Sequence, residues 1–131
     1  MLHCGGNDFG KVPILKLRND MKEDFIEIKK LLPDSCIVWS QILPRPRWLN
    51  GDIELEKSRE RVNSTIAKTV LEKHYGAYIK YPDIKIKSKV MFLEDGVHLS
   101  DLGNEIFLNI IQGGLEQIIS GVGNVFPDMN T

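Results

Sequence analysis

Two short segments of this sequence hold the residue types that acid–base chemistry requires. Asp95-Gly96-Val97-His98-Leu99-Ser100 places a carboxylate three residues before an imidazole, in a turn that contains a glycine. Such a carboxylate can fix the imidazole tautomer and stabilise its charged form, so the other ring nitrogen is free to accept a proton. Gly5-Gly6-Asn7-Asp8 puts a side-chain amide on a glycine-rich turn, where it can donate a hydrogen bond to a developing oxyanion. The alternatives are structural: a loop or capping histidine, and local turn hydrogen bonds.

Strand-like and helix-like patterns alternate along the chain and predict where these segments lie. Apolar residues recur every three or four positions in three stretches, and β-rich apolar runs separate them. We expect strands at 1–4, 35–42 and 77–81, helices at 14–32, 52–74 and 100–115, and a loop with a short strand at 82–92. Asp52 and Ser100 are the predicted helix caps, and Gly113-Gly114 is a weak point in the last helix. The alternation predicts an α/β layer fold with a mainly parallel sheet, whose sites lie at the carboxyl ends of strands.

Composition limits the class of protein and its partners. The 131 residues fit a single domain, and the net charge of −1 gives no reason to expect a nucleic-acid partner. No run reaches the length of a membrane span, and no apolar signal core follows Met1. Cys4 and Cys36 lie in apolar runs, which favours buried free thiols over a disulfide and a cytoplasmic location. Three scattered histidines and two distant cysteines do not form a metal site, and no cofactor is expected.

Other chemistry-bearing residues have simpler structural interpretations. His3 is expected to be structural, and His74 to favour the dipole at the end of its helix. Arg45, Arg47 and Trp48 could contact an anion or nucleic acid, but a solvated loop with a packed Trp is the favoured interpretation. Alternation with apolar residues predicts a half-exposed edge strand that carries Lys85, Lys87 and Lys89.

The two chemical segments, in this order, resemble blocks of the SGNH hydrolases, also called GDSL-type esterases and lipases. Gly5-Gly6-Asn7-Asp8 matches the G-x-N-D block, and Asp95-Gly96-Val97-His98 matches the D-x-x-H block. Val38–Arg45 resembles the strand and loop between these blocks, and the resemblance covers about residues 2–118. The H-x-G-G-N-D and W-S-x-x-L-P-R patterns are similar to SGNH-like domains of vertebrate retroelement-derived genes.

The resemblance implies a fold, a site and a ligand class. The fold would be a three-layer α/β/α, flavodoxin-like domain with a mainly parallel sheet over residues 1–120, followed by a flexible tail at 121–131. Asn7 would be the oxyanion donor, His98 the general base and Asp95 its orienting acid, while Gly5 and Gly6 form the turn. A small ester or acyl compound would be the ligand, without a cofactor.

One part of the family pattern has no counterpart here. The family's G-D-S block, which holds the nucleophile, lies upstream of G-x-N-D, and only four residues precede Gly5. We therefore expect an N-terminally truncated domain that is inactive as this chain, because a base without a nucleophile has nothing to activate. Ser40, in a strand, and Ser100, at a helix cap, are poor substitutes.

Three hypotheses follow from this departure. The chain is part of an acyl-ester hydrolase, or a non-catalytic binding module derived from one, or it assembles with a second chain that supplies the serine. A strand edge at Leu2–Cys4 would lack a neighbour, so we also expect a homo-oligomer or a second chain to pair there.

Overall fold

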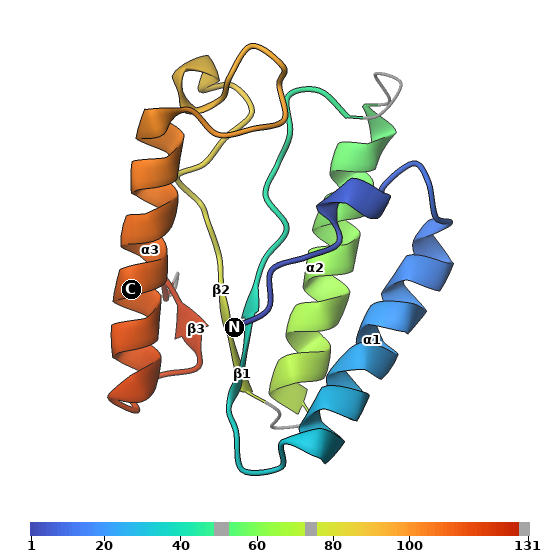
Figure 1. Ribbon diagram of the computed structural model, residues 1–131, viewed down its shortest axis with the longest axis vertical. Helices are drawn as coiled ribbons and strands as arrows, with labels where there is room; N and C mark the ends of the chain where they lie inside the picture. Colours follow the sequence, from blue (N-terminus) through green and yellow to red (C-terminus); the bar gives the residue numbers. More distant parts are fainter. Residues whose placement is uncertain (49–52, 73–75, 129–131) are drawn as a thin grey trace.

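A short parallel sheet forms the centre of the computed structural model, which describes residues 1–48, 53–72 and 76–128. Its strands β1 (Ile37–Ser40), β2 (Gly76–Ile79) and β3 (Val125–Phe126) lie in the order β1-β2-β3 and pair in parallel (Figure 1). Leu2 forms an isolated parallel bridge with Trp39, through backbone hydrogen bonds of 2.8 Å to Val38 and from Ser40. The strand predicted at 1–4 is therefore a single bridge at the edge of β1 away from β2.

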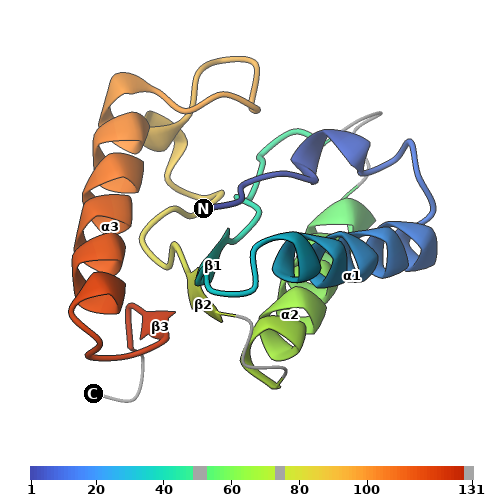
Figure 2. The ribbon, with the colours of Figure 1, turned by 60° about the horizontal axis from the view of Figure 1, so that its bottom comes forward.

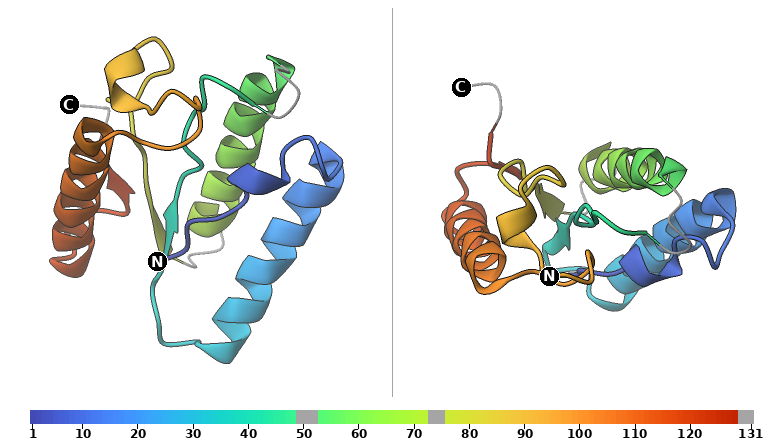
Figure 3. Two further views of the ribbon diagram at one scale, coloured as in Figure 1. Left: turned by 45° about the horizontal axis from the view of Figure 1, so that its top comes forward. Right: turned by 90° about the horizontal axis from the view of Figure 1, so that it is seen from above.

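Three helices cover the two faces of the sheet. α1 (Ile14–Leu31) and α2 (Glu54–Glu72) pack on one face, and α3 (Asp101–Ile119) packs on the other (Figures 2 and 3). The three predicted helices are thus confirmed, as is the three-layer α/β arrangement with a parallel sheet. None of the helices in the described part of the chain is both long and apolar enough to cross a membrane.

Alternation of side chains along β1 divides the core into two clusters. Ile37 and Trp39 point into the cluster with α1 and α2, whereas Val38 points into the cluster with α3. Trp39 is fully buried, and its ring meets the edge of Phe25 at a centroid distance of 5.7 Å. The α2 face predicted to be inward is buried throughout: Leu55, Val62, Ile66 and Val70.

The segment after β2 differs from the prediction. Residues 82–92 form successive turns and a 3₁₀ turn, η3 (Lys89–Met91), and no strand carries Lys85, Lys87 and Lys89. The Ile84 N–H bonds to the Tyr81 carbonyl, and the Ser88 N–H bonds to the Lys85 carbonyl, so the chain turns back twice. The edge of β2 that such a strand would extend is occupied by β3.

The C-terminal part also departs from the prediction. α3 runs through Gly113-Gly114 without a break. Glycine at position 114 leaves room for β2, since a Cβ there would lie 2.9 Å from Ile79 Cδ1. The segment from Gly121 was expected to be frayed, yet Val125–Phe126 pairs in parallel with Tyr78 and Ile79 of β2. The Phe126 ring packs against α3, and this contact stabilises the two-residue strand on the sheet.

Both cysteines are exposed, so the prediction of buried thiols is wrong. They are unbonded, as predicted. Cys36 precedes the first buried residue of β1, and Cys4 follows the Leu2 bridge, so each lies just outside the strand that the apolar run predicted. Asp52 and His74 lie outside the described residues.

Candidate functional site

Asp95 and His98 form a hydrogen-bonded pair in the loop that precedes α3. Asp95 Oδ2 lies 2.5 Å from His98 Nδ1. Asp95 Oδ1 accepts hydrogen bonds from the backbone N–H groups of Val97 and His98, at 2.8 and 2.9 Å. The hydrogen bond from His98 and these two backbone bonds lower the pKa of Asp95 to about 2. An ionised carboxylate can only accept, so His98 Nδ1 carries the hydrogen and Nε2 is left as a proton acceptor.

Asn7 lies in the 3₁₀ turn η1 (Gly6–Asp8) that follows the Leu2 bridge. Gly5, at the start of this turn, has a φ of 104°, in the left-handed region that glycine adopts readily. Arg45 Nη2 donates a hydrogen bond of 2.8 Å to Asn7 Oδ1. A Cβ on Gly6 would lie 2.8 Å from the same nitrogen, so glycine at position 6 leaves room for Arg45. With its oxygen occupied, the Asn7 amide presents its NH₂ group as a donor.

Asn7 and His98 line one cleft, which we call the His98 cleft. Its volume is about 680 Å³, and it is lined by residues 3–8, 42–45 and 97–99 and by Asn104, Phe107 and Leu108 of α3. These segments follow the Leu2 bridge, follow β1 and precede α3, so the cleft lies at the carboxyl ends of the strands, where open α/β sheets place their sites. No serine lines this cleft among the residues that the structure describes.

A buried asparagine of α2 holds the segment that links the cleft to β1. Asn63 is 4% exposed, and its side chain accepts from the Ile42 N–H at 2.9 Å and donates to the Ile42 carbonyl at 3.0 Å. Arg59 donates to the same carbonyl at 3.1 Å. Trp48, further along, donates from its indole N–H to Glu56 at 2.7 Å. Both ends of the 42–48 segment, which contains Arg45, are therefore hydrogen-bonded to α2.

Ser40 is part of a buried network and does not reach the cleft. It is fully buried at the end of β1, where its hydroxyl forms a short hydrogen bond with the Tyr81 hydroxyl. His3 Nδ1 lies 2.8 Å from Ser40 Oγ, and burial lowers the pKa of His3. This contact agrees with the expectation that His3 is structural. The lowered pKa favours the neutral ring in this hydrogen bond. Ser100 caps α3 by accepting from the Gly103 N–H, as predicted.

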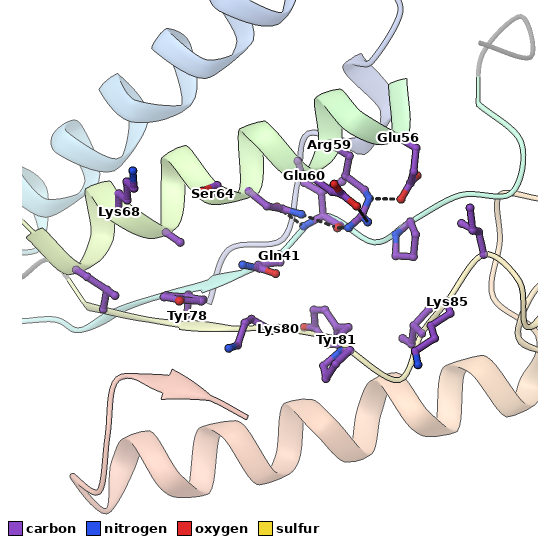
Figure 4. A pocket seen from close by; sticks show the side chains of 18 residues that line it. Gln41, Glu56, Arg59, Glu60, Ser64, Lys68, Tyr78, Lys80, Tyr81 and Lys85 are labelled. Atoms are coloured by element: carbon purple, nitrogen blue, oxygen red, sulfur yellow. Dashed lines mark hydrogen bonds and ion pairs between the residues drawn. The ribbon is translucent and has the colours of Figure 1, made fainter. Parts of the chain in front are cut away.

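A second groove, of about 730 Å³, runs between α2 and the end of β2 (Figure 4). Its polar walls include Glu56 and Arg59, which pair at 2.6 Å, together with Lys68, Lys80 and Lys85. None of the histidines that the structure describes lines it. Although it is slightly the larger of the two, both carboxylates that line it, those of Glu56 and Glu60, lie within ion-pair distance of Arg59. Within the described ranges, no cluster of three or more His, Cys, Asp or Glu side chains is arranged to hold a metal ion.

Sequence reasoning found the pair that is local and missed the contacts that are not. Asp95 and His98 are three residues apart, so their meeting could be predicted. Arg45 bonds Asn7 across 38 positions, and Asn63 bonds Ile42 across 21. No spacing in the sequence predicts these contacts. Arg45 does lie in the loop with Arg47 and Trp48 that the sequence marks as a possible anion contact.

The sequence matches no protein-family model and no curated protein. The structure is similar to that of the esterase domain of the ZfL2-1 ORF1 protein from the zebrafish ZfL2-1 retrotransposon. The TM-score is 0.66 and the identity 22%, and the match covers 88% of this chain and 70% of that one. At this identity the similarity concerns the fold alone, and it agrees with the three-layer α/β fold with a parallel sheet that the sequence predicts.

Proposed function

We propose that this domain supplies the acid–base half of an ester hydrolase site. His98 acts as the general base, Asp95 orients it, and Asn7 donates to the oxyanion, on the turn that Gly5 and Gly6 form. The observation that carries the proposal is the 2.5 Å contact between Asp95 Oδ2 and His98 Nδ1, in a loop that opens on the same cleft as Asn7. The ligand would be a small acyl ester.

The nucleophile in this proposal is a serine on a segment that pairs with the edge beside Leu2–Cys4, where no strand of the described residues lies. Leu2 uses its N–H and carbonyl toward β1, so the backbone of His3 faces the opposite side of this strand. His98 Nε2 would take the proton of the serine hydroxyl as its oxygen attacks the ester carbonyl, and would return that proton to the alcohol that leaves. Water then cleaves the acyl-serine by the same transfer.

A non-catalytic binding module is the second candidate. The observation that favours it is that Ser40 is fully buried and that no serine of the described residues lines the His98 cleft. Such a module would keep the cleft and bind an ester or acyl compound without turnover.

Hydrolysis of p-nitrophenyl acetate separates the two candidates. The chain alone should neither hydrolyse the ester nor react with a fluorophosphonate probe. A fusion that adds, before the N-terminus, a strand ending in Gly-Asp-Ser and a helical crossover, so that this strand can lie parallel to Leu2–Cys4, should gain both activities. His98→Ala should then remove the hydrolysis, and Asn7→Ala should lower it by about 10²- to 10³-fold. Labelling of a serine in the unfused chain that is lost in His98→Ala would place the nucleophile elsewhere and contradict the proposal.

The tautomer of His98 offers a test that needs no added segment. Nitrogen NMR of the uncharged imidazole should show the hydrogen on Nδ1 and none on Nε2. Asp95→Asn should remove this preference for one tautomer. A ring protonated on Nε2 in the unchanged chain would show that His98 cannot act as proposed.

A further inference from the structure

We propose that a cationic cavity beside the His98 cleft binds a negatively charged group, a carboxylate or a phosphate, on the ester that the cleft accepts. The inference deepens the proposed function and rests on it for the identity of the ester. It concerns specificity, which neither the Asp95–His98 pair nor Asn7 determines.

The cavity is small and adjoins the cleft directly. Its volume is about 320 Å³, and its walls include Asn7, Arg45 and Val97, all of which also line the His98 cleft. Phe9 and Trp48 form an aromatic wall, with ring centroids 5.3 Å apart, and both are buried. A ligand in the cleft can therefore extend one short substituent into this cavity.

Three cationic side chains line this cavity: Lys11, Arg45 and Arg47. Lys11 comes from the turn before α1, and Arg45 and Arg47 come from the 42–48 segment. Among the described residues no carboxylate shares the lining. Three acids close to these residues in the structure have other partners or line the cleft. Glu56 bonds Trp48 and Arg59, Asp95 bonds His98, and Asp8 lines the cleft. Three positive charges around one cavity create a positive potential, which attracts an anion.

Arg45 is held ready for such a group. Its guanidinium donates one hydrogen bond to Asn7 and lies over the Trp48 ring, 5.1 Å from the centroid. Burial lowers the pKa of Arg45, and no neighbouring carboxylate opposes this effect. A guanidinium has further N–H donors in one plane, which suit the paired oxygens of a carboxylate or phosphate. An oxyanion here would complete the hydrogen bonding of Arg45 while Asn7 stays oriented toward the cleft.

Binding of three small probes to the full chain tests the inference. The probes are butyl phosphate, monomethyl succinate and the neutral ester methyl butyrate, followed through the Trp48 indole N–H resonance. We expect at least one anion to bind about tenfold tighter than the neutral ester. The Lys11→Gln/Arg47→Gln double variant should lose about tenfold in anion affinity. The Lys68→Gln/Lys85→Gln variant is the matched control, because it removes the same charge from the groove in Figure 4.

The outcomes separate the sources and the hypotheses. Preference for butyl phosphate assigns the cavity to phosphate, and preference for monomethyl succinate assigns it to carboxylate. Equal affinity for the neutral ester, or equal losses in both double variants, would overturn the inference. If anion binding persists in His98→Ala, the cavity binds anions independently of the general base. The inference then holds even if the proposed hydrolysis fails. A Gly-Asp-Ser fusion that hydrolyses neutral and anionic esters at equal rates would overturn the specificity alone.

Discussion

The Arg45 guanidinium and the Asn7 amide are joined by a hydrogen bond of 2.8 Å from Nη2 to Oδ1. The bond links the turn after the Leu2 bridge to the segment after β1. It decides which end of the amide is free, because an oxygen that accepts from Arg45 leaves the NH₂ group to donate into the cleft. The residue that would stabilise an oxyanion is thus oriented by the residue that lines the cationic cavity.

The first prediction concerns this contact. Arg45→Met should lower the free energy of unfolding by about 1–2 kcal/mol, through the hydrogen bond to Asn7 and the contact with Trp48. Arg47→Met is the control, since the Arg47 side chain has no described hydrogen bond and should change stability by less than about 0.5 kcal/mol. Urea unfolding measures both. A double-mutant cycle of Arg45→Met with Asn7→Ala that shows no coupling would mean that the bond is absent in solution.

The second prediction is a loss of stability in acid that depends on Asp95. The pKa of Asp95 is about 2 in the folded chain and near the ordinary value of about 4 when unfolded. The unfolded state therefore binds a proton first as the pH falls. The stabilisation is complete above about pH 4 and is lost as the pH falls through about 2. Asp95→Asn should flatten the pH dependence of the urea midpoint over this range.

Carbon NMR of the Asp95 carboxyl group checks the same point directly. Its midpoint should lie near pH 2. A midpoint near the ordinary value would show that His98 and the backbone N–H groups of this loop do not hold the carboxylate in solution.

The third prediction concerns the attachment of the 42–48 segment to α2. Asn63→Ala should lower the free energy of unfolding by about 2–4 kcal/mol, because the buried N–H and carbonyl of Ile42 both lose their Asn63 partner. Asn109→Ala is the control: Asn109 is exposed on α3, and the change should stabilise the helix slightly, by up to about 0.5 kcal/mol. Denaturant unfolding compares the two variants. Equal effects would show that the Asn63 hydrogen bonds contribute nothing beyond helix propensity.

Several features of the fold could be predicted because they depend on local patterns. The spacing of Leu17, Met21 and Phe25 predicts the buried face of α1, and all three are buried. Ser100 caps α3, and Asp95 meets His98, within three residues. β3 could not be predicted in this way, since two residues carry no periodicity and its stability comes from β2 and α3. The strand predicted within 82–92 is wrong because alternation alone cannot show that β3 already occupies the edge of β2.

The last prediction concerns the buried network around Ser40. Ser40→Ala should lower the free energy of unfolding by about 1–3 kcal/mol, since it removes the hydroxyl between Tyr81 and His3. Calorimetry or urea unfolding measures this loss. A change below about 0.5 kcal/mol would show that neither group depends on Ser40.

The titration of Tyr81 gives the same network a pH signature. Burial raises its pKa to about 12, and the hydrogen bond from Ser40 partly opposes the rise. An unfolded tyrosine loses its proton near pH 10, so the unfolded state binds fewer protons than the folded state between about 10 and 12. Stability should therefore fall as the pH rises through this range. Phenolate absorbance, taken as the difference from Tyr81→Phe, should show a midpoint near 12, and Ser40→Ala should move it higher. The Tyr81 ring stacks on Phe107 at a centroid distance of 4.8 Å, and its hydroxyl bonds Ser40. A midpoint near 10 would mean that the ring is not buried in this way.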